Sequence, residues 1–368
     1  IEVVRRFHEA QLPHPEPVET LPGVVAWREW RPIGRAGLYA PGGRGPYPSS
    51  VVMLGIPAAL ASCGQVILCT PPDSHGNVPT ATLAAADLVG IERIFKLGGA
   101  QAIAAMAFGT ESVPKVDKLF GAGNPYVTAA KLLAFPGCAL DAPAGPSELL
   151  ILADELAEPD WIAADMLSGA EHGPDSAAVL VTPSAALGRK VSAALEKQLK
   201  ALPRKEVALQ ALTSRGLIVV TSSIVRAIDF VERYAPEHLE IVTADPRAVL
   251  DRVSNAASVF LGPHSANAAG DYATGTNHVL PTAGYARNYS AVSVESFGRL
   301  MQCQELTGAG LRSLVTTVAA LARSEGLEGH ARAVELRVEA WQTPKRRRRT
   351  RKVREPRSPN GARRPLLY

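Results

Sequence analysis

The chain has 368 residues, of which 46% are hydrophobic and 20% charged, a composition that excludes a largely disordered protein and suffices for one large or two ordinary domains. Aromatic residues make up only 5%, which argues against an aromatic nucleic-acid platform or a membrane belt. Residues 345–368 hold eleven basic residues and one acidic residue, so a tail charge of +10 within a total of +4 leaves −6 on the remainder.

The four cysteines, Cys63, Cys69, Cys138 and Cys303, show no CxxC spacing. We therefore expect buried thiols in a reducing compartment, and neither a disulfide framework nor a cysteine zinc site. The apolar stretch 51–69 is interrupted by glycine, proline and polar residues, which predicts a buried helix followed by a strand and not a membrane span. We expect a cytoplasmic protein without a signal peptide.

The chain opens with Ile1 and a charged helical stretch over residues 1–11, from which we expect an N-terminally incomplete product. Further on, strand-like apolar runs alternate with helical ones, as is typical of parallel sheets joined by crossover helices. These runs cover residues 66–69, 81–89, 93–96, 100–107, 149–153, 159–170, 178–182, 185–202 and 216–220.

The sequence DAPAGPSE at 141–148 interrupts this alternation and predicts a division of the chain. Residues 293–340 are predicted to be largely helical, with two amphipathic helices hinged at 326–329. Beyond residue 343, arginine, proline and serine dominate, and this tail should be disordered because it cannot bury a core.

Four polar stretches of the chain could carry chemistry, namely those at His172, 237–238, 269–281 and His330. His172 is expected at the end of a helix over 160–172, which Gly173-Pro174 terminates, so its imidazole either binds a divalent metal or caps the last carbonyls. Glu237 and His238 follow Pro236, and they form either a general-base pair or only a polar turn.

The stretch 269–281 is read as a polar loop that holds Asp271 and His278 among glycine, asparagine and threonine, as either a site or a simple corner. His330 follows the hinge and by itself indicates a helix start. No GxGxxG opens a helix, but the pairs Gly42-Gly43, Gly98-Gly99 and Gly121-x-Gly123 each follow a strand-like run and could approach a pyrophosphate.

Seven segments in order resemble the histidinol dehydrogenase family, from about residue 28 to 334. They are GLYAPGG, GGAQAIAAMAFGTESVPKVDKLFGAGN, DAPAGPSE, SGAEHGPDS, APEHLE, AGDYATGTNHVLPT and EGLEGHARAV. The resemblance implies an α/β fold of two Rossmann-like parallel-sheet units plus a small C-terminal helical element, assembled as a homodimer with shared active sites.

Together with the pattern, it divides the chain into five parts. These are a partial N-terminal segment (1–38), a Rossmann-like unit lining the dinucleotide site (39–148), a second such unit with metal and acid–base residues (149–290), a helical dimerisation element (291–343) and the basic tail (344–368).

The resemblance also implies a role for each site residue. His172 and Asp271 would bind zinc, with His330 completing the shell from the neighbouring subunit, and Glu237 and His238 would be the acid–base pair. Ser147, His278 and Glu325 would contact the substrate, and Tyr39, Gln101 and Asn124 would line the dinucleotide site. The implied reaction is oxidation of L-histidinol to L-histidine through L-histidinal, with Zn²⁺ and two hydride transfers to NAD.

One position departs from the family motif, which has glutamine three residues before the metal-binding histidine. Here that residue is Gly169, so we expect weaker metal retention. Oxidation of another small polyol and a catalytically impaired partial chain are alternatives. The Arg-rich tail has no counterpart in the family; nucleic-acid binding through it would fall steeply with salt, and we expect no specific binding.

Overall fold

The computed structural model describes residues 1–42 and 45–342, so Gly43 and the predicted basic tail lie outside the described residues. Within these ranges the strands form two five-stranded sheets and one three-stranded sheet. Residues Ile1–Pro15 and Glu29–Met301 form one compact unit. Glu16–Arg28 and the described residues after Met301 form a second unit.

The first sheet of the large unit has the order β5-β4-β3-β6-β7, and its neighbouring strands are parallel. The elements of this half are α1 (Glu2–Glu9), β3 (Arg35–Tyr39), α2 (Pro48–Leu60), β4 (Gln65–Thr70), α3 (Thr80–Leu88), β5 (Arg93–Lys96), α4 (Gly99–Phe108), β6 (Lys118–Phe120), α5 (Pro125–Ala134) and β7 (Ala139–Leu140). The expected buried helix and strand within 51–69 are therefore confirmed as α2 and β4.

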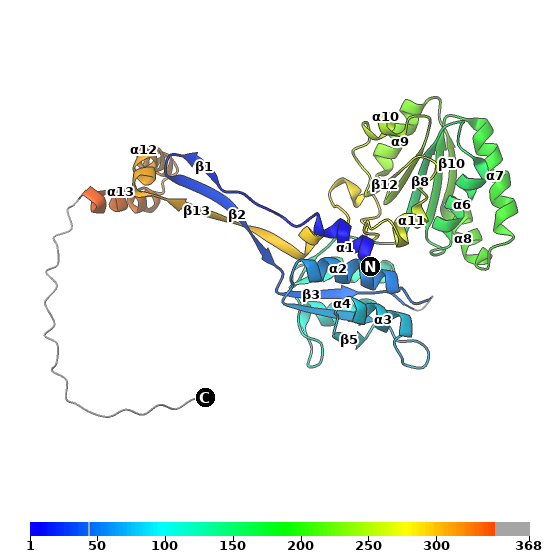
Figure 1. Ribbon diagram of the computed structural model, residues 1–368, viewed down its shortest axis with the longest axis horizontal. Coiled ribbons are helices and arrows are strands. Elements are labelled where there is room, and N and C mark those ends of the chain that lie inside the picture. The colour runs from blue at the N-terminus through cyan, green and yellow to red at the C-terminus, as the bar shows by residue number, and fades with distance from the viewer. Residues whose placement is uncertain (43–44, 343–368) are drawn as a thin grey trace, which may run out of the picture. The chain divides into compact units, whose positions relative to one another are not determined.

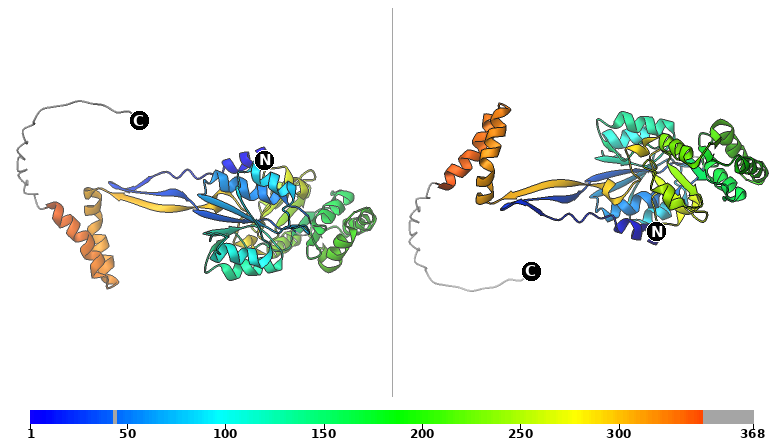
Figure 2. Two further views of the ribbon diagram at one scale, coloured as in Figure 1. Left: turned by 90° about the horizontal axis from the view of Figure 1, so that it is seen from below. Right: turned by 90° about the horizontal axis from the view of Figure 1, so that it is seen from above.

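Alternate residues of the central strands enter two separate cores. Leu38 and Leu68 pack against α2 and α3, whereas Ile67 and Cys69 pack against α4 and α5. In Figure 2 the blue helices α1 and α2 and the cyan helices α4 and α5 accordingly lie on opposite sides of this sheet. A parallel sheet covered on both faces needs apolar residues at successive positions, which is why its strands appear as continuous apolar runs in the sequence.

The second sheet repeats this plan with the order β10-β9-β8-β11-β12, again with parallel neighbours. Its elements are β8 (Glu148–Ala153), α6 (Pro159–Ala170), β9 (Ala177–Thr182), α7 (Ala185–Leu199), α8 (Lys205–Arg215), β10 (Gly216–Val220), α9 (Ile224–Tyr234), β11 (His238–Val242), α10 (Pro246–Leu250), β12 (Ser258–Leu261) and α11 (Asn267–Tyr272). Counted within each half, both sheets have the order 3-2-1-4-5 of doubly wound folds, which confirms the predicted pair of Rossmann-like units.

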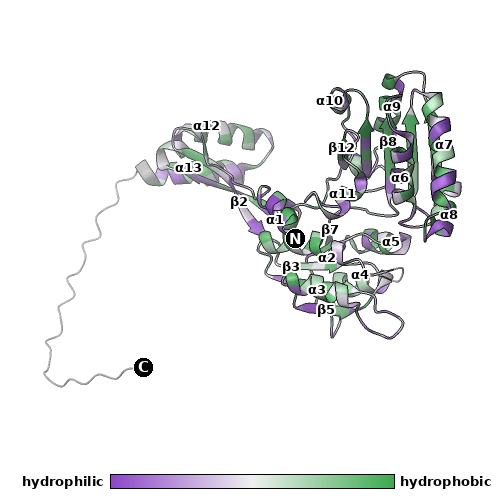
Figure 3. Cartoon of the chain, turned by 45° about the vertical axis from the view of Figure 1, so that its right-hand side comes forward, coloured by the Kyte–Doolittle hydropathy of each residue, from purple (hydrophilic) through white to green (hydrophobic). Residues whose placement is uncertain are grey.

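Strand β8 shows how this half is layered. Leu149 and Ile151 pack against α6, α7 and α8, and Leu150 and Leu152 pack against α9 and α10. Figure 1 shows the two groups of helices on either side of the sheet, and Figure 3 shows β8 as hydrophobic while α7 alternates between polar and apolar residues. Short 3₁₀ turns at Tyr285–Arg287 and Val294–Phe297 complete the large unit.

The second unit contains helices α12 and α13 and strand segments. Its elements are β1 (Val18–Leu21), β2 (Val24–Pro32), β13 (Gly298–Leu306), α12 (Gly308–Ser324) and α13 (Glu328–Gln342). Residues 29–32 of β2 and 298–301 of β13 are assigned to the large unit. The two helices predicted around the 326–329 hinge are confirmed. Strand β13 was missed because most of its residues are exposed, so it has no continuous apolar run.

The four cysteines differ in how deeply they are buried. Cys69 and Cys138 are buried as expected, and burial raises the pKa of their thiols to about 12 and about 11. Cys63 and Cys303 are only partly buried, so the expectation of four buried thiols was wrong for these two. No helix among residues 1–42 and 45–342 is both long and apolar enough to cross a membrane.

The fully buried His8 of α1 connects this helix to the polar segment after α11. Its Nδ1 donates to the Val4 carbonyl at 2.7 Å, and Asn277 Nδ2 lies 3.2 Å from its Nε2 and donates to the Met53 carbonyl at 2.7 Å. Because Asn277 presents N–H groups to Nε2, the neutral imidazole is the form that fits. Burial accordingly lowers the pKa of His8, although carbonyls of Val4 and Val292 oppose the shift.

This environment predicts a pH-dependent contribution to stability. A histidine whose pKa is lowered by folding stabilises the fold above its unfolded value of about 6.5, and this stabilisation is lost as the pH falls through the lowered folded pKa. We expect the difference in thermal midpoint between the native protein and His8→Leu to shrink as the pH is lowered from 7 to 5. A pH-independent difference between the two proteins would contradict this role of His8.

Candidate active site

A cavity of about 410 Å³ lies where the carboxyl edge of the first sheet faces the amino edge of the second. Strands β3 and β6 end there, at Tyr39 and Phe120, and strands β8 and β11 begin there, at Glu148 and His238. Eight of the predicted site residues line this cavity, namely Tyr39, Asn124, Ser147, His172, Glu237, His238, Asp271 and His278.

Glu237 and His238 are positioned by the turn from α9 into β11. Ala235 ends α9 in a left-handed conformation with φ 53°, and after Pro236 the chain enters the strand. Glu237 Oε2 accepts hydrogen bonds from the Ser147 hydroxyl at 3.1 Å and from the Glu148 N–H at 2.7 Å. The carboxylate is therefore held in one orientation, in contact with its neighbour His238.

The His238 ring lies between carboxylates. Its Nδ1 is 3.1 Å from the Glu148 carbonyl and 3.3 Å from Glu237 Oε2, and its Nε2 is 3.8 Å from Asp271 Oδ1. Because a carbonyl only accepts, Nδ1 carries a proton and Nε2 is the basic nitrogen of the neutral ring. Burial opposes the imidazolium, but the charges of Glu237 and Asp271 outweigh it and raise the pKa of His238 to about 9.

The second carboxylate oxygen of Asp271 lies near His172. His172 Nε2 lies 3.8 Å from Asp271 Oδ2, and the His172 ring makes no hydrogen bond within the described part of the chain that would cap α6. The expected helix over 160–172 was too long: α6 ends at Ala170, so His172 lies two residues beyond it.

The prediction of a loop around Asp271 was also wrong in part, because residues 267–272 form the short helix α11. Gly270 in its middle disfavours helix by propensity, but any Cβ there would clash with the Phe260 ring. Close packing on β12 thus overrides the local preference. From α11 onward the segment returns to the site, where His278 Nδ1 donates to the Asp271 carbonyl at 2.9 Å and burial lowers the pKa of His278.

Glycine loops form the other side of the cavity, after the strands that the sequence indicated. Gly121 has φ 116°, and a Cβ there would clash with the Tyr39 carbonyl, so only glycine fits. The Tyr39 hydroxyl accepts the Gly99 N–H at 3.1 Å, and Asn124 Oδ1 caps α5 by accepting the Val127 N–H at 3.0 Å. Both side chains therefore fix the backbone around the cavity.

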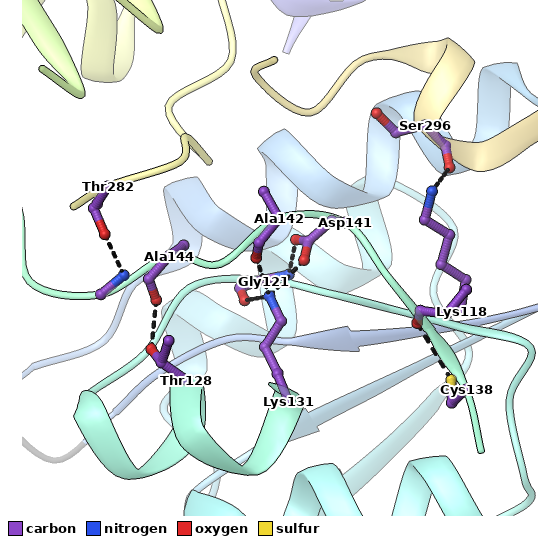
Figure 4. Close-up of polar contacts among 12 residues, drawn as sticks. Lys118, Gly121, Thr128, Lys131, Cys138, Asp141, Ala142, Ala144, Thr282 and Ser296 are labelled. Atoms are coloured by element: carbon purple, nitrogen blue, oxygen red, sulfur yellow. Dashed lines mark hydrogen bonds and ion pairs between the residues drawn. The ribbon is translucent and has the colours of Figure 1, made fainter. Parts of the chain in front are cut away.

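A buried ion pair supports the Gly121 loop from below (Figure 4). The Lys131 ammonium pairs with Asp141 and donates to the carbonyls of Gly121 at 2.8 Å and Ala142 at 3.0 Å. Asp141 in turn accepts the Gly121 N–H at 2.7 Å. Both polar groups of Gly121 are thus satisfied by side chains whose exposure is 1% for Lys131 and 2% for Asp141.

Replacing Lys131 by methionine leaves the Asp141 charge buried and unpaired. We expect this variant to lose about 3–5 kcal/mol of unfolding free energy, measured by urea denaturation. The double variant Lys131→Met/Asp141→Leu should recover most of that loss, because it removes the buried charge as well. A loss below about 1 kcal/mol in the single variant, the size of a surface pair, would contradict this account.

The structure does not bring all predicted residues to this cavity. Gln101 is exposed on α4 and is absent from its lining, while Glu325 and His330 are exposed residues of the second unit, at the end of α12 and the start of α13. The helix start read from His330 is confirmed. Conversely, Glu171, Asp175 and Arg204 line the cavity without having been predicted.

Glu171 and Asp175 could have been found from their positions near His172 in the segment SGAEHGPDS, whereas no local signal marks Arg204. Arg204 lies in the turn between α7 and α8, far along the chain from the other polar positions of the site. We assign the chain to the α/β enzymes with paired Rossmann-like units, since the two sheets jointly place a histidine–carboxylate cluster opposite glycine loops.

The chain belongs to the histidinol dehydrogenase family of oxidoreductases, whose family model, described as histidinol dehydrogenase, matches residues 1–338. It is 52% identical over 339 residues to the histidinol dehydrogenase of Vibrio parahaemolyticus, covering 91% of this chain and 78% of that protein. The match to the Aliivibrio fischeri histidinol dehydrogenase is also 52%, over 91% and 76%.

A crystal structure of histidinol dehydrogenase from Elizabethkingia anophelis superimposes with a TM-score of 0.90 at 47% identity, covering 93% of this chain and 79% of that one. The resemblance drawn from the seven segments and the predicted fold are therefore confirmed.

Proposed function

We propose that the chain catalyses the NAD-dependent oxidation of L-histidinol to L-histidine through L-histidinal, the last steps of histidine biosynthesis. The observation that carries this proposal is the contact of Glu237 with His238 in the same cavity as the His172–Asp271 pair. Family membership supports the substrate, since the relatives named above are histidinol dehydrogenases.

His238 is proposed to take the proton of the substrate alcohol on Nε2 when its ring is neutral, the form that becomes populated as the pH approaches the raised pKa of about 9. The charges of Glu237 and Asp271 stabilise the imidazolium that this transfer produces. Bound NAD would accept the hydride that leaves the same carbon, which converts the alcohol into the aldehyde. Ser147 and the Glu148 N–H hold Glu237 in place, from where its carboxylate would activate a water molecule for attack on the aldehyde. A second molecule of NAD would accept the hydride of the resulting hydrate, and release of the hydrate's two protons to solvent would leave the carboxylate.

The donor set at the cavity fits a zinc ion in part. Donor atoms bound at about 2.0–2.2 Å to one ion lie no more than roughly 4.4 Å apart, and His172 Nε2 and Asp271 Oδ2 are 3.8 Å apart. Among the described residues no group of three or more histidine, cysteine or acidic side chains is placed to hold a metal. When bound, zinc would anchor the imidazole and amine of the substrate and polarise its oxygen.

The remaining roles follow the family resemblance and stay predictions. His330 of the partner subunit would complete the metal shell in a homodimer, and the 291–343 element would form the dimer contact. His278 and Glu325 would contact the substrate, while Tyr39, Gln101 and Asn124 would line the dinucleotide site. The division at residues 38, 148, 290 and 343 is likewise proposed.

The proposed function is tested by following NADH formation in a zinc-supplemented assay of the purified chain with histidinol. We expect turnover with histidinol and none with simple diols, because only histidinol carries the imidazole and amine. Turnover of a diol in preference to histidinol would favour the alternative of another polyol dehydrogenase. No turnover of either substrate would favour the impaired partial chain.

Gly169 provides a test of the metal site. It is buried on α6 three residues before His172, and a Cβ there would lie 3.1 Å from Leu149 Cβ, so a side chain requires a small shift. We expect Gly169→Gln to retain zinc about tenfold more tightly in a chelator competition, because its amide oxygen adds a donor. Gly169→Ala controls for the shift alone. Equal zinc retention in native and Gly169→Gln proteins would contradict the expected weakness.

A further inference from the structure

Two carboxyl groups near the catalytic residues, those of Asp165 and Glu240, have no part in the proposed reaction. Glu240 lies two residues after His238 on β11. Glu240 on β11 is 1% exposed, and the half-buried Asp165 on α6 is a second carboxyl close enough to influence its ionisation. Buried carboxylic acids are costly when ionised, so an interior pair of them calls for a physical explanation.

The geometry of β11 explains why Glu240 meets α6. Leu239 and Ile241 enter the core under α9, so the alternate residues His238, Glu240 and Val242 face the opposite side, where Val242 packs in the core of α6. Glu240 therefore shares a strand face with His238, two residues away.

The Glu240 carboxyl also forms a hydrogen bond with the first residue of α11. Glu240 Oε1 accepts the N–H of Asn267, the first residue of α11, at 2.7 Å. Asp271 lies one turn further along α11, and His172 lies two residues beyond the end of α6. The Asp165–Glu240 pair thus connects the three elements that place His172, His238 and Asp271.

The hydrogen bonding of this pair requires a proton. Glu240 Oε2 is buried and has no donor among the described residues, and the side chain that approaches Glu240 is another carboxyl. Two carboxylates offer only acceptors to each other, whereas one protonated carboxyl donates to the other. Burial raises the pKa of both acids, and Asp165 raises that of Glu240 further, while His238 opposes this.

We propose that Asp165 and Glu240 share one proton at neutral pH, and that this hydrogen-bonded pair is a positioning pair that holds α6 and α11 against β11 behind the catalytic histidine. The shared proton is independent of the reaction, whereas the catalytic consequence rests on the proposed function.

Infrared spectroscopy tests the proton directly. The native protein at pH 7 is expected to show the C=O band of a protonated carboxyl that disappears in Glu240→Gln and in Asp165→Asn, because each amide replaces the shared proton as donor. Asp154→Asn is the matched control: Asp154 follows β8 at the other edge of the sheet and also accepts backbone N–H groups, from Leu156 and Ala244. This variant should keep the band.

Absence of such a band from the native protein, or its persistence in both amide variants, would overturn the shared proton. It would do so whatever the enzyme activity, because the measurement needs neither substrate nor NAD. Glu148, whose pKa burial raises to about 7, would contribute a separate band that Glu148→Gln removes and the pair variants leave unchanged.

Kinetics tests the positioning role. We expect Asp165→Ala to lower kcat with histidinol about tenfold or more, since small displacements of catalytic groups are costly, and Asp165→Asn to restore it to within about twofold. An asparagine variant as impaired as the alanine variant would contradict positioning by the hydrogen bond. If Asp165→Ala does not fold, the infrared bands and the kcat of the two amide variants still decide.

Discussion

His238→Asn is expected to lower kcat with histidinol by about 10²–10⁴-fold, the range for loss of a general base, while KM changes little. The asparagine amide can donate to the Glu148 carbonyl in place of Nδ1, so the start of β11 should keep its position. What it lacks is a basic nitrogen at the position of Nε2, beside Asp271. Steady-state kinetics with saturating NAD and zinc measures the effect.

A matched control is available in His264, which is exposed beside the Trp161 ring and is absent from the cavity lining. His264→Asn should keep kcat within about twofold of the native value, as surface substitutions generally do. If His238→Asn retained more than a third of native kcat, His238 would not be the base, and the assignment of proton transfer would have to be abandoned.

Asp271→Asn is expected to weaken zinc retention by at least about 100-fold, because even the loss of a group that only supports a ligand costs 10–100-fold. The asparagine removes the negative charge next to His172, but it leaves the main-chain carbonyl that accepts from His278. Turnover should fall with the bound zinc and recover only in part at saturating metal. Chelator competition gives the affinity, and kinetics across zinc concentrations gives the activity.

Asp175→Asn is the comparison for this experiment, because Asp175 also lines the cavity but forms no ion pair with His172. We expect its zinc retention to match that of the native protein. If Asp271→Asn kept zinc as tightly as Asp175→Asn does, the ion would have to bind elsewhere, and His172 with Asp271 could not be its site.

Much of the large unit could be predicted from local patterns. The predicted strands at 93–96 and 216–220 coincide with β5 and β10, because their short runs of apolar residues follow helical segments, as is typical of alternating α/β folds. Strand β13 has no continuous apolar run and was not predicted. Helix α11 was not predicted because Gly270 and its polar neighbours are typical of a loop.

The site could be predicted only from the family resemblance. From local sequence alone, Glu237-His238 remained compatible with a polar turn and His172 with a helix cap. Their contacts depend on how β11, α6 and α11 pack, over distances in the chain that no short motif spans. The Asp165–Glu240 pair was missed altogether, since an isolated acid in a helix, such as Asp165, normally indicates a solvated face, and Glu240 gave no sign of a partner on another element.

The counting of NADH per molecule of histidinol tests the central claim most directly, because a single cavity is proposed to serve both oxidations. With limiting histidinol, excess NAD and added zinc, we predict two NADH and one histidine for each histidinol consumed. One NADH per histidinol with free aldehyde accumulating, or no NADH from the folded, zinc-loaded protein, would contradict the account.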